Sequence, residues 1–206
     1  MVSAVGSRDF VYYVDFPDDG WVTPPEPGES IAAWADDVVG DLRAQEGTAV
    51  ALGSQLRGYG QSYRELEAET GALWIPQVDD GVLATLWADV LVAEPEMATI
   101  EAVLQAERAR AATTAVAEDQ PSVEVVRLPA GPAVRTRMLE LGGHGLTGTA
   151  QLAEQVSHLI VPAPAVHDEG RPAVVRHVVG WVLLEHGDEL AELADDCAAL
   201  VEIERL

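Results

Sequence analysis

The sequence of 206 residues contains no lysine: all 12 of its basic residues are arginine, against 35 acidic residues. This absence excludes the P-loop nucleotide-binding enzymes, because their phosphate-binding loop requires a lysine. It also excludes the Schiff-base enzymes, whose nucleophile is a lysine amine. Protein kinases and class A β-lactamases depend on lysines as well, so the chain belongs to none of these classes.

Cysteine and long hydrophobic runs are also scarce. Cys197 is the single cysteine, so the chain can form no disulfide within itself and no cysteine-based zinc site. The longest apolar stretch, Val178–Leu184, is far shorter than the roughly 20 residues that cross a bilayer. The first residues lack the basic and apolar regions of a secretory signal. We therefore expect a cytoplasmic protein, with Cys197 buried in a C-terminal helix.

The charge balance limits the range of partners. The formal net charge is −23, whereas nucleic acids and anionic membrane surfaces bind positively charged proteins. We expect neither as a partner and favour a protein partner, and a basic one would suit this charge. The length and the 48% hydrophobic content predict a single α/β domain over residues 1–206.

Hydrophobic periodicity predicts the secondary structure. Apolar residues recur every three or four positions in four helical segments, residues 31–42, 52–66, 95–110 and 190–201. Apolar and β-branched residues predict seven strands, residues 10–16, 72–78, 82–92, 123–128, 133–139, 156–161 and 174–184. Turns at Asp79–Gly81 and Pro129–Pro132 join neighbouring strands as hairpins. The order predicts an α/β (α+β) three-layer sandwich, with a mainly antiparallel central sheet of about six to seven strands and helices on both faces.

Several short motifs at turns and strand ends occur in the same order. They are Gly20-Trp21, Leu-Trp-Ile-Pro at 73–76, Leu-Pro-Ala-Gly-Pro-Ala-Val-Arg at 128–135, and Val161-Pro162. In this order the chain resembles proteins of high-GC Gram-positive bacteria with a PsbP-like α/β/α sandwich. The resemblance implies a fold and no activity, and it favours an accessory or binding protein over an enzyme.

Histidines supply the main alternative. His158 and His177 fall on two strands that we expect to be neighbours. A symmetric hairpin would pair His158 with Val178 and place the two imidazoles on opposite faces of the sheet. A slip of one residue would bring them together, with Glu185 or Glu154 as a carboxylate ligand. We favour two structural histidines and expect no metal, cofactor or catalytic residue.

A glycine-rich loop, residues 142–148, resembles a phosphate cradle. Such cradles gain affinity from the helix that follows them, whereas here a strand is expected to follow. We therefore interpret the loop as a hairpin connection.

The aromatic residues near the N-terminus give the one candidate binding surface. Trp21 lies near Tyr12, Tyr13 and Phe16 in the sequence, with Asp15, Asp18 and Asp19 beside them. Aromatic anchors surrounded by charged residues are typical of protein interfaces. These four aromatic residues are the predicted partner-binding site.

The favoured interpretation is a non-catalytic cytoplasmic accessory or partner-binding protein. Two alternatives remain open. One is a small hydrolase or metal-dependent enzyme that uses the strand histidines. The other is an acidic chaperone or immunity-type protein that binds a basic partner.

The charge imbalance predicts that salt stabilises the protein. With 35 carboxyl groups and 12 arginines, most acidic residues cannot have a cationic neighbour, so the folded chain repels itself. Raising sodium chloride from about 0.02 M to about 0.5 M shortens the screening length severalfold. We expect the melting temperature at neutral pH to rise by several degrees. An unchanged melting temperature would contradict the claim that self-repulsion affects stability.

Overall fold

The computed structural model describes residues 8–17, 19–66, 68–114, 116, 121–141 and 152–206. Its helices are α1 (Ile31–Asp41), α2 (Glu46–Leu66), α3 (Ile100–Thr114) and α4 (Gly187–Ala199), with short 3-10 turns η1 (Val78–Asp80) and η2 (Leu184–His186). Its strands are β1 (Phe10–Val14), β2 (Trp21–Val22), β3 (Thr70–Trp74), β4 (Ala84–Val92), β5 (Ser122–Leu128), β6 (Gly131–Leu141), β7 (Leu152–Ile160), β8 (His167–Asp168), β9 (Arg171–Trp181) and β10 (Val201–Arg205). The glycine-rich loop and Asp18 lie outside the described residues.

The central sheet has the strand order β2-β3-β4-β9-β7-β6-β5, and β8 pairs with the end of β9. Every neighbouring pair of strands among the described residues is antiparallel. β9 lies near the middle, and residues of both parities, including Val174, Val175, Val178 and Val179, are buried. Such a continuous apolar run is expected of a strand covered on both faces. The predicted α+β class with a mainly antiparallel sheet is confirmed.

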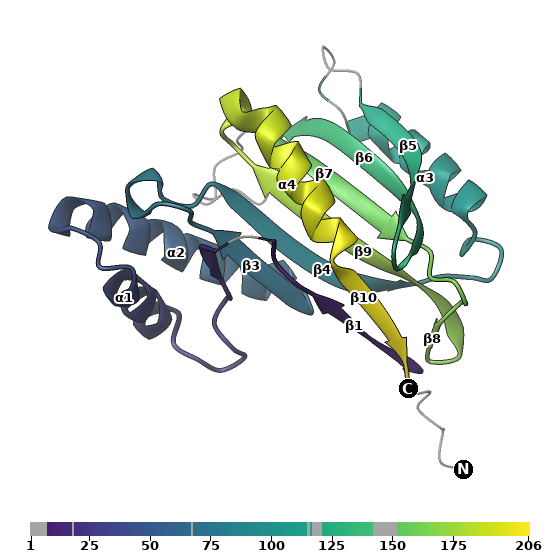
Figure 1. Cartoon of the computed structure of the whole chain (residues 1–206), viewed down its shortest axis with the longest axis horizontal. Helices are drawn as coiled ribbons and strands as arrows, with labels where there is room; N and C mark the ends of the chain where they lie inside the picture. Colours follow the sequence, from purple (N-terminus) through teal and green to yellow (C-terminus); the bar gives the residue numbers. More distant parts are fainter. Residues whose placement is uncertain (1–7, 18, 67, 115, 117–120, 142–151) are drawn as a thin grey trace.

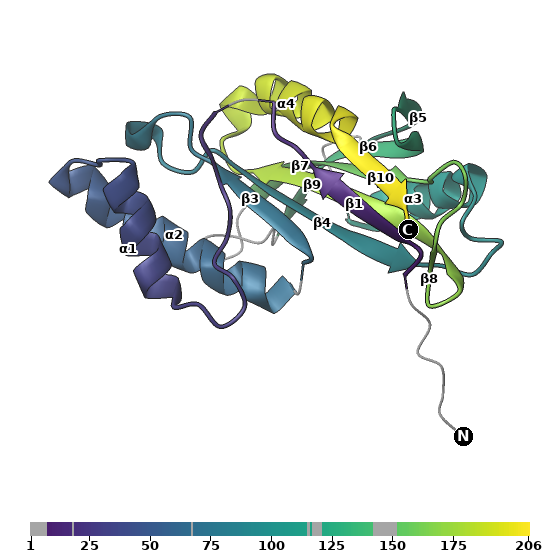
Figure 2. The ribbon, with the colours of Figure 1, turned by 60° about the horizontal axis from the view of Figure 1, so that its bottom comes forward.

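Different elements cover the two faces of this sheet (Figures 1 and 2). On one face lie α4 and a two-stranded sheet in which β1 pairs with β10. On the other face α1 and α2 pack around Leu73 at the β3 end, and α3 packs around Val134 at the β6 end. None of the helices in the described part of the chain is long and apolar enough to span a membrane.

The C-terminus differs from the prediction. The sequence predicts a helix as far as residue 201, but α4 ends at Ala199 and β10 follows at once. Val201 is buried, Ile203 is partly buried, and Glu202 and Glu204 are exposed, which is the alternation of a strand. β10 pairs with β1 from Val14↔Val201 to Phe10↔Arg205, so the predicted N-terminal strand belongs to this small sheet. As predicted, Cys197 is buried in α4.

The first predicted hairpin is correct in pairing and wrong in its turn. β3 and β4 are antiparallel neighbours, but β3 ends at Trp74 and a longer connection with the turn η1 follows. Pro76 has no N–H to donate to the sheet, which explains why the pairing stops before the predicted Asp79–Gly81 turn.

The second predicted hairpin, β5–β6, is confirmed. Leu128 pairs with Gly131 across a turn of two residues. Gly131 has φ +148°, and a Cβ atom there would lie 2.5 Å from the carbonyl oxygen of Val161. The turn therefore requires glycine both for its backbone conformation and for its close approach to the end of β7.

Replacement of Gly131 by alanine tests this requirement. We expect Gly131→Ala to lower the free energy of unfolding by roughly 1–3 kcal/mol, because the backbone must shift or remain strained. Urea unfolding measures the change. Gly40→Ala is the matched control: Gly40 lies in α1, and a Cβ atom added there would meet no atom within 4 Å. We expect this control to stabilise the helix by about 0.5–1 kcal/mol. Equal effects of the two substitutions would contradict the requirement for glycine at 131.

Candidate functional site

The register between β7 and β9 brings the two histidines together. His158 lies directly opposite His177, with ring centroids 6.0 Å apart. The symmetric pairing of His158 with Val178 is therefore wrong, and the two rings share the face that α4 covers. The reason is hydrophobic: the observed register pairs Val156 with Val179, whereas the expected one would have placed Gly180 opposite Val156.

A carboxylate does join the pair, but it comes from α4. Asp195 Oδ1 lies 3.0 Å from His158 Nε2 and accepts a hydrogen bond of 2.7 Å from Arg135 Nε. Burial disfavours the charged form of Asp195, but the hydrogen bonds with His158 and Arg135 outweigh it and lower the pKa of this carboxyl. The expected ligand Glu154 instead accepts hydrogen bonds from Arg137 and Trp181, and Glu185 lies in η2.

His177 is the more unusual of the two histidines. It is 0% exposed, and neither ring nitrogen has a hydrogen-bond partner among the described residues. Burial and the neighbouring His158 lower its pKa to about 3, so the ring is neutral at physiological pH. No group of three metal-binding side chains occurs in the described part of the chain. His158 is only 1% exposed, and neither imidazole lines the cleft, the hollow or the groove described below.

The four predicted partner-binding aromatics do not form one surface. Tyr13 points outward from β1 and is 53% exposed. Tyr12 lies on the opposite side of the same strand, and its hydroxyl donates a hydrogen bond of 3.1 Å to the carbonyl of Ala88; burial raises its pKa to about 12. Phe16 stacks on Trp21 with ring centroids 4.8 Å apart, and both pack against the core under α4. The structure thus joins Phe16 with Trp21 and separates them from Tyr13, and a binding role for the four residues stays a prediction.

The opposite face of the sheet contains a cleft that the sequence analysis missed. Because α2 and α3 cover opposite ends of this face, a cleft of about 290 Å³ remains over β4, β9 and β7. Leu66 at the end of α2 lines one side, and Glu107 and Arg110 of α3 line the other. The floor residues come from strands that are far apart in the sequence: Trp87, Leu91, Glu140, Gln155, Ser157, Leu159, Arg176 and Val178.

Three of the four charged side chains that line the cleft, Glu107, Arg110 and Arg176, are held in ion pairs. The fourth, Glu140, accepts a hydrogen bond of 3.2 Å from the side-chain amide of Gln155. The guanidinium of Arg176 lies 4.5 Å from the ring centroid of Trp87 and donates to both carboxylate oxygens of Asp89, at 2.9 and 2.5 Å. Arg110 donates to both oxygens of Glu107, at 3.1 and 2.7 Å. Bidentate pairs of this kind fix the orientation of both partners.

Ser157 is the exception in the cleft. It is 3% exposed, and its hydroxyl oxygen has no hydrogen-bond partner among the described residues. A buried hydroxyl without a partner costs about 1–3 kcal/mol.

An arginine within an apolar strand, as at Arg176, was the one sequence signal of this site.

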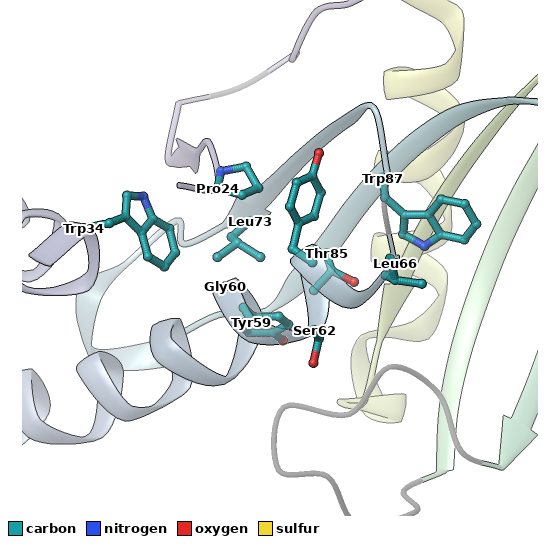
Figure 3. Close-up of a pocket in the computed structure, with 10 residues that line it drawn as sticks. Pro24, Trp34, Tyr59, Gly60, Ser62, Leu66, Leu73, Thr85 and Trp87 are labelled. Carbon is teal, nitrogen blue, oxygen red and sulfur yellow. The ribbon is translucent and has the colours of Figure 1, made fainter. Parts of the chain in front are cut away.

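A small apolar hollow of about 30 Å³ adjoins the cleft (Figure 3). The hollow and the cleft share Leu66 and Trp87. Its other walls include Tyr59 and Gly60 of α2 and Leu73 and Thr85 of the sheet (Figure 3). The remaining lining residues are Pro24, Trp34, Ser62 and Tyr63. A hollow of this volume holds a small group such as a methyl or one or two water molecules.

Comparison with known proteins identifies the class of fold. No model of a known protein family and no curated protein matches the sequence. LpqN of Mycobacterium tuberculosis, a protein involved in cell envelope biogenesis, shares the fold: the TM-score is 0.53, with 14% identity over 98% of this chain and 86% of LpqN. The cyanobacterial PsbP of Synechocystis sp. PCC 6803 is less similar, with a TM-score of 0.42 and 10% identity over 99% of this chain and 98% of that protein. The weak PsbP-like resemblance is confirmed for the fold alone.

The buried His177 predicts acid sensitivity. Its pKa in the folded protein, about 3, lies below the ordinary histidine value of 6.5, so below pH 6.5 the unfolded chain binds a proton that the folded protein does not. The contribution to stability is full above pH 6.5 and is lost as pH falls toward 3. When the pH is lowered from neutral to about 5, we expect His177 to reduce the free energy of unfolding of the wild type by about 2 kcal/mol. A His177→Leu variant should not show this loss.

Urea unfolding of both proteins at the two pH values measures this difference. At neutral pH we expect His177→Leu to be at least as stable as the wild type, because it removes two unpaired ring nitrogens. His186→Leu removes the half-exposed His186 and serves as the control for loss of a histidine. An identical pH dependence of the wild type and His177→Leu would disprove the assignment.

Proposed function

We propose that this chain is a non-catalytic accessory protein that binds its ligand or partner in the cleft between α2 and α3. The buried hydroxyl of Ser157 carries the proposal, because it lies at the cleft floor without a partner among the described residues. A bound molecule that supplies a hydrogen bond there would remove the cost of the unpaired group. The apolar side chains beside it, Trp87, Val178 and Leu159, together with a few oriented polar groups, are typical of binding sites.

The histidine alternative has less support. A hydrolase or metal-dependent enzyme would need His158 and His177 within reach of a substrate. They are 1% and 0% exposed and lie beneath α4, where Asp195 binds His158. Their placement supports a structural role.

A larger groove, of about 770 Å³, follows the loop 23–28 and the end of α2. We favour the cleft over this groove for two reasons. The loop side chains Glu26 and Pro27 are exposed, and no described residue that lines the groove has a buried polar atom without a partner.

A basic protein partner is a second candidate, and one surface favours it. On the exposed side of the β1–β10 sheet, Tyr13 lies opposite Glu202, and Glu204 is exposed on the same strand. An aromatic residue among carboxylates suits a basic surface, and such binding weakens steeply with salt. The cytoplasmic location stays a prediction, since the likeness to LpqN extends to the fold alone.

Filling the junction of cleft and hollow tests the leading proposal. N-phenyl-1-naphthylamine, an uncharged probe that fluoresces in apolar sites, should bind the wild type saturably with one probe per chain. Leu66→Trp places a larger side chain where the cleft and the hollow meet. We expect it to raise the dissociation constant of the probe at least about tenfold, which corresponds to about 1.4 kcal/mol of binding free energy. Circular dichroism confirms that the variant is folded.

Leu184→Trp makes the same replacement at a residue outside the cleft that is 39% exposed, and it should bind the probe as the wild type does. Unchanged binding by Leu66→Trp, or equal losses in the two variants, would show that the cleft is not the binding site.

A further inference from the structure

We infer that the cleft takes an uncharged ligand with a flat apolar body and one hydroxyl or carbonyl group that hydrogen-bonds to Ser157. This inference rests on the proposed function and adds the chemical class and orientation of the ligand. Three observations carry it: the residues in line across the floor, the ion pairs of both arginines of the cleft, and the buried Ser157 hydroxyl, which has no partner among the described residues.

The strand register places three floor residues in a row. Trp87 lies opposite Val178, and Val178 lies opposite Ser157 on its other side. Neighbouring strands are about 4.8 Å apart, so the backbones of Trp87 and Ser157 are about 10 Å apart. A two-ring molecule lying on Val178 therefore reaches from the indole to the hydroxyl.

The apolar side chains determine where the body of the ligand lies. Trp87 and Leu66 border the hollow at one end, and Leu159 lies near Ser157 on the same strand, two residues along. The apolar extension of the cleft thus starts at Trp87, and the unpaired hydroxyl lies at the other end of the row. This arrangement orients the ligand with its polar group toward β7.

The ion pairs disfavour a charged ligand. Both arginines of the cleft already bind carboxylates, Arg176 with Asp89 and Arg110 with Glu107. Glu107 also accepts a hydrogen bond of 3.2 Å from Thr136. An anionic ligand would have to displace a carboxylate from its arginine, and it would approach a chain of net charge −23. A cationic ligand would compete with Arg110 for Glu107, and at Glu140 it would compete with the hydrogen bond from Gln155.

The unpaired hydroxyl provides selectivity. A site built around a hydrogen-bonding group rejects an analogue that lacks the matching group, because its own buried polar atom then stays unpaired. Ser157 both donates and accepts, so a hydroxyl and a carbonyl both satisfy it.

Three probes with the same ring system test the inference at neutral pH: 2-naphthol, naphthalene and 2-naphthoate. Isothermal titration or NMR line shifts give the dissociation constants. We expect 2-naphthol to bind wild type about tenfold more tightly than naphthalene, and 2-naphthoate to bind most weakly. Ser157→Ala should weaken 2-naphthol about tenfold and leave naphthalene unchanged, whereas Ser54→Ala, on the exposed side of α2, should change neither.

The failures of the two proposals are distinguishable. Tightest binding of 2-naphthoate would show an anion site and overturn the inference. Equal binding of 2-naphthol and naphthalene, or an unchanged 2-naphthol affinity in Ser157→Ala, would also overturn the inference. The proposed function would still stand in that case, provided that the probes bind saturably in the cleft. If none of the probes bound, both the inference and the proposed function would fail.

Discussion

The register between β7 and β9 is the constraint on which both faces of the sheet depend. Because side chains alternate along a strand, one register decides what lies on each face. On one face it joins Val156 with Val179 beneath α4 and makes neighbours of His158 and His177. On the other face the same register places Ser157 beside Val178. The buried histidine pair and the cleft floor therefore both follow from the same β7–β9 register.

The two faces of the sheet differ in the elements that cover them. α4 and the β1–β10 sheet close over one face, so the polar groups there contact other protein groups rather than solvent (Figure 2). On the other face the covering helices lie at opposite ends, and a cleft remains between them over the middle strands. His158 and His177 lie in the first setting, whereas Ser157 lies in the second, at the floor of the cleft that we propose as the binding site.

The scarce arginines connect elements that are distant in the sequence. Arg8 binds Glu69 and Asp168, at 2.7 and 3.0 Å, and Arg137 binds Glu154 and Asp188, at 2.6 and 2.8 Å. Hydrogen bonds from these guanidiniums to the carboxylates raise the pKa of both arginines despite partial burial. Exposed pairs contribute about 0–1 kcal/mol each. Their importance is geometric, since Arg8 ties the segment before β1 to Glu69 and β8, and Arg137 ties the start of α4 to β6 and β7.

Local patterns in the sequence determined the class of fold. Apolar periodicity predicted the four helices of the described residues, and the Pro129–Pro132 turn predicted the β5–β6 hairpin, because these features depend on neighbouring residues. Only the tertiary structure decided the register of His158 and His177, the strand after Ala199 and the cleft. The physical reason is distance along the chain. The partner of His158 is Asp195, 37 residues later. Trp87 and Ser157 lie about 10 Å apart because β9 lies between their strands and pairs with both. Packing across the whole sheet selects such contacts, and no local pattern specifies them.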